Sequence, residues 1–330
     1  MIGEVSVIVP LYNSQKYIQR LFNNFREQTY RSFIVYFIDD GSTDDTAMIA
    51  SELVKTDCRF RLLQKRNGGP SSARNFGLKS ALSDGTPYLM FVDSDDYFDR
   101  DYFEKMIGLI SEYDVDIVFA SHFFNDKPKK EYLPCDTVMD SFSSLCLILG
   151  DQVITSQSHH KIFKKEVWQD VLFPENTYFL EDTATIYKTI LKSQRCLISN
   201  YRGYHYNVSN SESITKQTIC NKYIICGWRS LYSIITNDFS VYDSEQIRII
   251  NKKAKSLFID NFLELFPRIK NPDKAEKKEV RFYYSYAKRK NYILAYECKN
   301  RRQIIKKVVF FAIPCLYRPL FKLFLFLKKP

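Results

Sequence analysis

The stretch YLMFVDSDD, from Tyr88 to Asp96, joins a short apolar run to a turn that carries carboxylates. A continuous apolar run of this length is typical of a fully buried strand, and the polar turn ends it. Outward along the chain, apolar runs at 5–9, 33–38 and 60–63 also end in polar turns and are followed by helical apolar spacing. Strand, turn and helix, repeated four times, predict a doubly wound α/β sheet.

Polar side chains gather where these predicted strands end. In open α/β sheets, ligands bind at the edge formed by the carboxyl ends of the strands. We therefore expect one crevice to contain six residues that lie far apart in sequence: Tyr12, Asp40, Asn67, Arg74, Asp93 and Asp95. The expected N-caps of the helices after the first and third strands are Ser14 or Asn13 and Ser71 or Ser72.

Two common nucleotide-binding motifs, GxxxxGK[ST] and GxGxxG, are absent. P-loop NTPases and dinucleotide-binding Rossmann enzymes are therefore disfavoured. Without a glycine-rich cradle, a phosphate site needs another positive charge, and carboxylates at a strand end can recruit it as Mg²⁺ or Mn²⁺. Asp93 and Asp95 form such a pair, although an isolated pair of this kind is more often an ordinary turn before a helix.

Charge is distributed unevenly along the chain. Residues 1–214 hold 23 Lys/Arg and 29 Asp/Glu, whereas residues 215–330 hold 25 Lys/Arg and 9 Asp/Glu. From about residue 215 the pattern is helical and basic. This asymmetry predicts two functional parts, the second facing an anionic partner, for which phospholipid and nucleic acid are the candidates.

The expected setting is the cytoplasm. The eight cysteines form no CxxC pair, so neither a zinc framework nor a redox pair is indicated. The start of the chain shows no signal-peptide pattern, and free thiols fit a reducing compartment.

The last segment, 308–327, is apolar but is divided by Arg318, Lys322 and two prolines into pieces too short for a membrane span of ~20 residues. Lys pairs at 306–307 and 328–329 flank it. Apolar pieces between cations favour an amphipathic segment lying on an anionic membrane surface, with a core helix as the alternative.

Four motifs occur in order at the predicted strand ends: VSVIVPLYN (5–13), FIDDGSTDDT (37–46), NGGPSSARNFG (67–77) and FVDSDD (91–96). Together they resemble the family 2 glycosyltransferases, which have the GT-A nucleotide-diphospho-sugar transferase fold. The resemblance covers residues 5–110, and YFLEDTAT (178–185) extends it to about residue 214. It implies a GT-A catalytic domain at 1–214 and a basic helical region at 215–330.

The resemblance also implies roles for individual residues. It assigns Pro10, Tyr12 and Asn13 to the nucleobase and Asp40 to the uracil N3–H. Arg74 lies along the nucleotide, Asp93 near the ribose, and Asn67 and Ser94 complete the nucleotide-sugar site. Read alone, Tyr12 is as well explained as a packed loop aromatic, and a lone Arg is more often a surface residue.

The same resemblance implies a metal site and a catalytic base. Asp95 and Asp93 are the expected ligands of Mg²⁺ or Mn²⁺, with His205 as a third ligand or a phosphate donor. Inverting transfer needs a carboxylate that takes the proton of the acceptor hydroxyl. Asp182 is the expected base and Glu181 the supporting residue, although acids at a helix start are also ordinary capping.

The expected function is therefore a metal-dependent, inverting glycosyltransferase at the inner face of the cell membrane. It would transfer a sugar from a UDP-sugar to a lipid-linked saccharide in surface polysaccharide or glycolipid synthesis. One alternative is a nucleic-acid-binding protein that uses the basic half, but its cations lack a reader motif and nucleic acid is not the expected partner. Another is a nucleotidyltransferase of similar fold.

Overall fold

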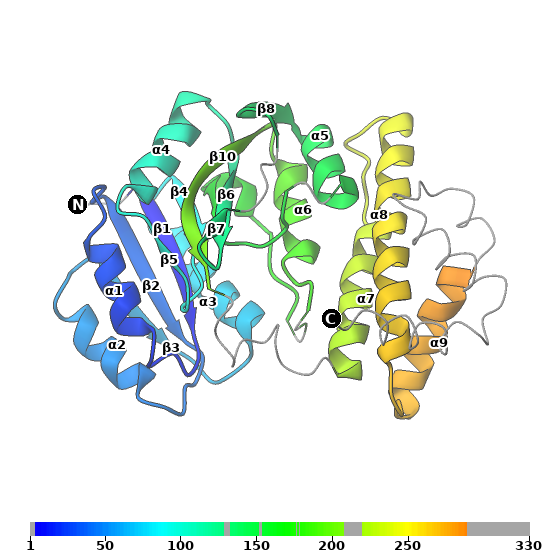
Figure 1. The fold of residues 1–330 in the computed structure, drawn as a ribbon, viewed down its shortest axis with the longest axis horizontal. Coiled ribbons are helices and arrows are strands. Elements are labelled where there is room, and N and C mark those ends of the chain that lie inside the picture. The colour runs from blue at the N-terminus through cyan, green and yellow to red at the C-terminus, as the bar shows by residue number, and fades with distance from the viewer. Residues whose placement is uncertain are drawn as a thin grey trace. The chain divides into compact units, whose positions relative to one another are not determined.

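The computed structural model of the chain describes residues 4–128, 133–151, 154–175, 177, 179–207 and 220–288. It forms two compact units, Met1–Gln217 and Thr218–Pro330 (Figure 1). The predicted domain boundary between residues 214 and 215 falls outside the described residues and stays a prediction.

The first unit is built on one ten-stranded sheet with the main order β3-β2-β1-β4-β9-β6-β10-β5. β7 is added beside β6, and β8 beside β10. The strands are β1 (Val5–Leu11), β2 (Phe33–Asp39), β3 (Phe60–Gln64), β4 (Tyr88–Phe91), β5 (Tyr97–Phe98), β6 (Ile117–Phe124), β7 (Lys127–Pro128), β8 (Thr137–Asp140), β9 (Lys161–Lys164) and β10 (Arg195–Tyr206).

The sheet is mixed. β1 to β4 pair in parallel, as four consecutive strand–helix repeats require. β9 is antiparallel to both of its neighbours, β4 and β6. The structure thus has the predicted doubly wound mixed sheet, and the carboxyl ends of β1, β2, β3 and β4 lie at one edge.

Helices cover both faces of the sheet (Figure 1). On one face, Phe25 packs on Phe33 and Phe37, with ring centroids 6.0 and 6.4 Å apart. On the other face, Gly77 lies so close to Ile8 and Ile38 that an added Cβ would approach Ile8 to 2.7 Å. The helices of this unit are α1 (Ile18–Arg26), α2 (Thr46–Val54), α3 (Pro70–Ser83), α4 (Tyr102–Glu112), α5 (Ser141–Cys146) and α6 (Thr183–Lys192), with short turns η1 (Leu147–Asp151) and η2 (Lys165–Trp168).

Two predicted N-caps are wrong. α1 begins only at Ile18, because the Ser14 carbonyl accepts from the amides of Tyr17 and Ile18 in a preceding turn. The N-cap of α3 is Gly69 at φ 84°, a left-handed conformation that glycine adopts without strain, and the helix starts at Pro70.

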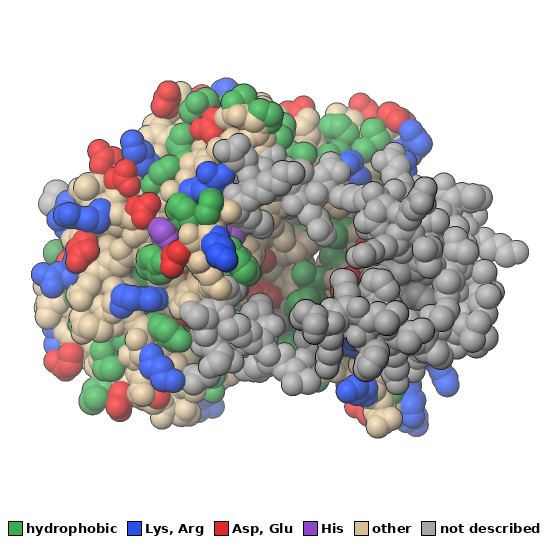
Figure 2. Space-filling model, in the orientation of Figure 1, with side chains coloured by type: hydrophobic (Ala, Val, Ile, Leu, Met, Phe, Trp, Pro, Cys, Tyr) green, Lys and Arg blue, Asp and Glu red, His purple; other side chains and the backbone are tan. Residues whose placement is uncertain are grey.

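Charges on the first unit are interspersed. In the space-filling view, its Lys and Arg side chains alternate with Asp and Glu over the visible face (Figure 2). This distribution agrees with the near balance of charges in residues 1–214.

The second unit is helical, as predicted. Its elements are α7 (Asn221–Ile235), α8 (Ser244–Leu265), η4 (Phe266–Arg268) and α9 (Lys274–Lys288). Buried Trp228 of α7 packs on Phe262 of α8 and Tyr283 of α9, with ring centroids 4.5 and 6.0 Å apart. The apolar segment 308–327 lies outside the described residues. Within the described part of the chain, no helix combines the length and apolarity that crossing a membrane requires.

Candidate active site

The loop after β1 carries an exposed aromatic side chain on a fixed backbone. Asn13 has a left-handed φ of 49°. Its amide donates to Ser42 Oγ at 3.1 Å, and its side-chain oxygen accepts from the Thr43 amide at 2.9 Å. These bonds tie the β1 loop to the β2 loop and leave Tyr12 53% exposed. The structure therefore places Tyr12 where a planar ligand could stack on it, while Asn13 holds the loops together. Pro10 lies just before them, inside β1.

Asp40 follows β2 and is buried within the edge. Its carboxylate accepts from the amides of Gly68 and Gly69, at 3.0 and 2.7 Å, and pairs with Lys65 Nζ at 2.5 Å. The Asn67 side chain donates to the Asp40 carbonyl at 3.0 Å. Asp40 and Asn67 are thus brought together as expected, but Asp40 is held by the loop after β3 rather than facing open space. A contact between Asp40 and uracil stays a prediction that requires this loop to open.

Arg74 of α3 connects the two acidic parts of the site. Its guanidinium is buried and donates to Asp93 at 2.9 Å through Nη2. Nη1 lies 3.4 Å from Glu181 and 3.9 Å from Asp182, and the group is 5.5 Å from the centre of the Phe173 ring. The side chains of Asp93, Glu181 and Asp182 therefore meet around one cation, although 89 positions separate Asp93 from Asp182.

Glu181 and Asp182 directly precede α6, with side chains 16% and 17% exposed. Burial, and then the adjacent Asp182 charge, raise the pKa of Glu181 to about 7, against the opposing effect of Arg74. Burial also raises the pKa of Asp182, and again Arg74 opposes the shift. A carboxylate that is partly desolvated but kept ionised by a cation is suited to take a proton near neutral pH.

We expect Arg74→Gln to lower the free energy of unfolding by about 3–5 kcal/mol, because it leaves three carboxylates around an uncompensated site. The loss should be larger at pH 8 than at pH 5. Loss of the cation raises the folded-state pKa values of Glu181 and Asp182 further, so these carboxylates destabilise the fold when ionised, and this penalty disappears as falling pH protonates them. Thermal melts of wild type and variant across this pH range measure the difference. An equal loss at both pH values would contradict the charge argument.

The turn after β4 contains a group of possible metal ligands. Ligand atoms of Asp93, Asp96 and His159 lie within 4.8 Å of one another. Asp93 is 26% exposed. Asp96 and His159 are buried, and Asp96 accepts from Tyr204 Oη at 2.7 Å and from the Asn207 amide at 2.8 Å. Carboxylate oxygens suit Mg²⁺ or Mn²⁺, so the residue types at this turn fit a divalent ion.

Ser94 and Asp95 complete this turn. Ser94 Oγ lies 2.9 Å from Ser14 Oγ, which links the β4 turn to the β1 loop. The Asp95 carbonyl accepts from Arg20 and from the Asn207 side chain, and this fixes its backbone beside the turn. The structure thus brings Tyr12, Ser94 and the acidic residues to one edge of the sheet, as the sequence predicts.

His205 is placed differently from the expectation. Its ring lies between Tyr97 and Phe123, with centroids 4.4 and 4.6 Å away and nearly parallel planes. Nε2 contacts Asp99 at 2.9 Å, and Nδ1 contacts Asp126 at 3.2 Å. Both ring nitrogens are therefore engaged away from Asp93, and the structure does not bring His205 into the group of possible ligands.

His159 is the site residue that sequence reasoning missed. Its ring lies nearly parallel to those of Tyr204 and Tyr206, at 5.0 and 5.2 Å. It precedes β9, the strand inserted beside β4, and forms a bridge with Phe91. The only signal in the sequence is a His pair before a short apolar segment, and its meaning depends on knowing that β9 pairs with β4.

The structure therefore has an exposed aromatic ring, a turn suited to a divalent ion and a half-buried carboxylate pair at one edge of a mixed α/β sheet, which is the arrangement expected from the resemblance to GT-A glycosyltransferases. Residues 6–172 match the family described as Glycosyl transferase family 2, and the chain belongs to this family. The predicted family and fold are thus confirmed.

Curated relatives agree. Uncharacterized glycosyltransferase EpsJ of Bacillus subtilis is 28% identical over 230 residues, which are 66% of this chain and 64% of EpsJ. Poly(ribitol-phosphate) beta-N-acetylglucosaminyltransferase TarS of Staphylococcus aureus is 30% identical over 207 residues, which are 61% of this chain and 35% of TarS. The matched segment spans less than two thirds of the length of either relative.

Solved structures share the fold. Staphylococcus aureus TarS in complex with UDP-GlcNAc superposes with a TM-score of 0.68 at 22% identity, covering 88% of this chain and 81% of that one. A mannosyltransferase from Pyrobaculum calidifontis in complex with GDP-Man and Mn²⁺ gives a TM-score of 0.54 at 16% identity, covering 95% of this chain and 88% of that one. At these identities the likeness concerns the fold alone.

Proposed function

We propose that the chain transfers a sugar from a UDP-sugar, with inversion at the anomeric carbon, to a saccharide acceptor carried on a lipid. The observation that carries this proposal is the cluster of Asp93, Arg74, Glu181 and Asp182 at the same edge of the sheet as exposed Tyr12. Tyr12 offers a surface on which a nucleobase can stack, and the turn at Asp93 offers a place for the diphosphate. Asp182 supplies a carboxylate that can activate the acceptor hydroxyl. The complex of TarS with UDP-GlcNAc supports a uridine nucleotide as the donor class.

Each part of the site has a separate task in this proposal. The Tyr12 ring stacks on the nucleobase, and Asp40 and Asn67, on the loops after β2 and β3, contact it once the loop after β3 has opened. Asp182 accepts the proton of the acceptor hydroxyl as its oxygen attacks the anomeric carbon, while Arg74 keeps Asp182 ionised and in place. Mg²⁺ or Mn²⁺ at the Asp93–Asp95 turn would neutralise the charge that grows on the leaving diphosphate.

A hydrolysis screen of the purified protein against a panel of nucleotide sugars tests the donor. We expect slow release of UDP and free sugar from one UDP-sugar, with little release from GDP- or CDP-sugars. Release of UMP together with a sugar phosphate would instead indicate a nucleotidyltransferase and would overturn the proposal.

The membrane part of the proposal rests on sequence. Residues 306–330 combine two Lys pairs with many Phe and Leu residues. Each large apolar side chain contributes ~1.5–3 kcal/mol when fully buried, and each cation at an anionic leaflet adds about 1 kcal/mol that salt weakens. We propose that this segment holds the enzyme on the inner face of the cell membrane, close to a lipid-linked acceptor.

Deleting residues 306–330 is therefore expected to move the protein to the soluble fraction and to lower transfer to a lipid-linked acceptor. Donor hydrolysis should change little, because the candidate site lies at the edge of the sheet in the first unit. Fractionation of cells expressing both forms, with a high-salt wash, measures the effect. The wash should release the full-length protein only partly. If both forms partition alike, the segment is not a membrane anchor.

A further inference from the structure

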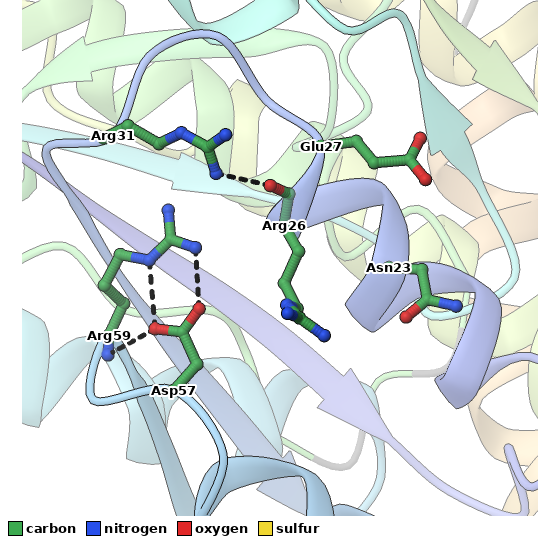
Figure 3. A pocket seen from close by; sticks show the side chains of 6 residues that line it. All are labelled: Asn23, Arg26, Glu27, Arg31, Asp57 and Arg59. Carbon is green, nitrogen blue, oxygen red and sulfur yellow. Dashed lines mark hydrogen bonds and ion pairs between the residues drawn. The ribbon is translucent and has the colours of Figure 1, made fainter.

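A pocket lies at the amino ends of the parallel strands, at the opposite end of these strands from the candidate active site. Its volume is about 470 Å³, and it is lined by Asn23, Arg26, Glu27, Arg31, Asp57 and Arg59 (Figure 3). These residues lie near the end of α1 and just before β2 and β3, at the amino ends of both strands. β2 spans seven residues, so about 20 Å of strand separates this pocket from the edge that holds Asp40. A ligand in the pocket therefore cannot be part of the donor site.

The pocket has an excess of guanidinium groups. Three arginines and two carboxylates line it, and among the described residues Asp57 pairs with an arginine whereas Glu27 does not. Asp57 accepts from Arg59 Nε at 3.0 Å and from Nη2 at 2.7 Å. Glu27 extends away from the arginines (Figure 3). With the Asp57–Arg59 pair neutral and the Glu27 charge counted, the lining keeps a net charge of +1, and Arg26 and Arg31 are its two cations that form no ion pair with the described residues.

The arginines are held in place but keep donors unused. The Arg59 guanidinium lies 4.5 Å from the centre of the Phe33 ring, and its Nη1 is buried without a hydrogen-bond partner in the described part of the chain. Arg31 donates one bond, to the Arg26 carbonyl. The Arg26 guanidinium makes no hydrogen bond or ion pair with the described residues and lies 5.8 Å from the Phe22 ring centre. It is still close enough to Asp57 to add to the lowering of the Asp57 pKa that Arg59 causes.

We propose that this pocket binds a phosphate group, either of a soluble phosphate compound or of a lipid headgroup. Planar guanidinium groups with free N–H donors match the oxygens of a phosphate, and several cations around one pocket suit a doubly charged anion. The Asp57–Arg59 pair and the Arg31 bond orient the donors before binding, so little side-chain freedom is lost. The anion also supplies acceptors for the N–H groups of Arg26 and Arg31 that the described residues leave unpaired.

Calorimetric titration of the full-length protein with inorganic phosphate, in the presence of EDTA, tests the site. Arg26→Gln removes a cation whose side chain makes no hydrogen bond within the described chain, so the fold should be kept. We expect it to weaken phosphate binding about tenfold or more. Arg61→Gln is the matched control, because this exposed arginine of β3 does not line the pocket. It should bind phosphate as the wild type does.

A second arm separates the two sources of phosphate. Vesicles containing phosphatidic acid are compared with vesicles in which phosphatidylglycerol supplies the same negative charge, so that any attraction of residues 306–330 to anionic lipid is equal in both, using the wild type and both variants. A loss of phosphatidic-acid binding in Arg26→Gln identifies a lipid headgroup, whereas unchanged vesicle binding with weakened inorganic phosphate binding identifies a soluble ligand. Absence of phosphate binding by the wild type, unchanged phosphate binding by Arg26→Gln, or an equal loss in Arg61→Gln would overturn the site.

Discussion

Asp182→Asn is expected to lower turnover by about two to four decades while donor binding stays near the wild-type level. The amide keeps the size of the side chain and its place before α6, but it cannot accept a proton, and general-base catalysis contributes roughly this factor. Donor affinity should persist because the residues proposed to contact the nucleotide, Tyr12 and Asn67, lie on other loops. Steady-state transfer rates and calorimetric titration with UDP measure the two quantities separately.

Glu181→Gln is the matched control for Asp182→Asn. Both changes remove one negative charge next to Arg74, so they perturb the electrostatics of the pair similarly. Only Asp182→Asn should remove the base, and Glu181→Gln should retain most of the turnover. The opposite ranking, with Glu181→Gln inactive and Asp182→Asn active, would show that Glu181 takes the proton.

The parallel half of the fold could be predicted because its signals are local. Each of β1 to β4 is a short apolar run followed by turn residues, and α1 and α4 have a clear apolar face. The exact ends of the strands are harder to predict from the sequence than their presence. β1 continues through Pro10 to Leu11, because its pairing with β4 ends at Ile8 and Pro10 lies beside β2 alone, where the missing N–H is tolerated.

The insertion of β9 between β4 and β6 could not be predicted in this way. Its four residues carry no alternation that distinguishes them from a loop, and their pairing joins segments more than 40 positions apart. Only this insertion brings His159 to the acidic turn. The bridge from Asp93 through Arg74 to Glu181 has the same origin, because it depends on where α3 and α6 pack and not on sequence spacing.

His205 illustrates the opposite case, in which the structure places a predicted ligand away from the acidic turn. A lone His near the end of the catalytic domain suggested a ligand, but nothing in the sequence indicated that Asp99 and Asp126 would flank it. The His205 ring is stacked between Tyr97 and Phe123 and contacts a carboxylate through each of its nitrogens. These contacts hold the ends of β5, β6 and β10 together. The structure therefore gives this histidine a bridging position.

Removal of the divalent ion is expected to lower transfer by about three decades or more, since a bound metal contributes several kcal/mol to stabilising the leaving group. EDTA should have this effect on the wild type, and excess Mn²⁺ should reverse it. Asp95→Ala should have the same effect without reversal. Transfer rates measured against Mn²⁺ concentration provide the test.

Two possible ligand sets share Asp93, and the variants distinguish them. Asp96 is completely buried and its two oxygens already accept from Tyr204 and Asn207, whereas Asp93 and Asp95 are only half-buried. Asp93 and Asp95 are therefore better placed than Asp96 to coordinate an ion that also contacts the diphosphate. On this argument, His205→Gln should leave the half-saturating Mn²⁺ concentration unchanged, because its nitrogens are engaged elsewhere. The alternative is that Asp93, Asp96 and His159 hold the ion. In that case His159→Gln should raise the half-saturating Mn²⁺ concentration without changing the melting temperature, and Asp95→Ala should leave that concentration unchanged.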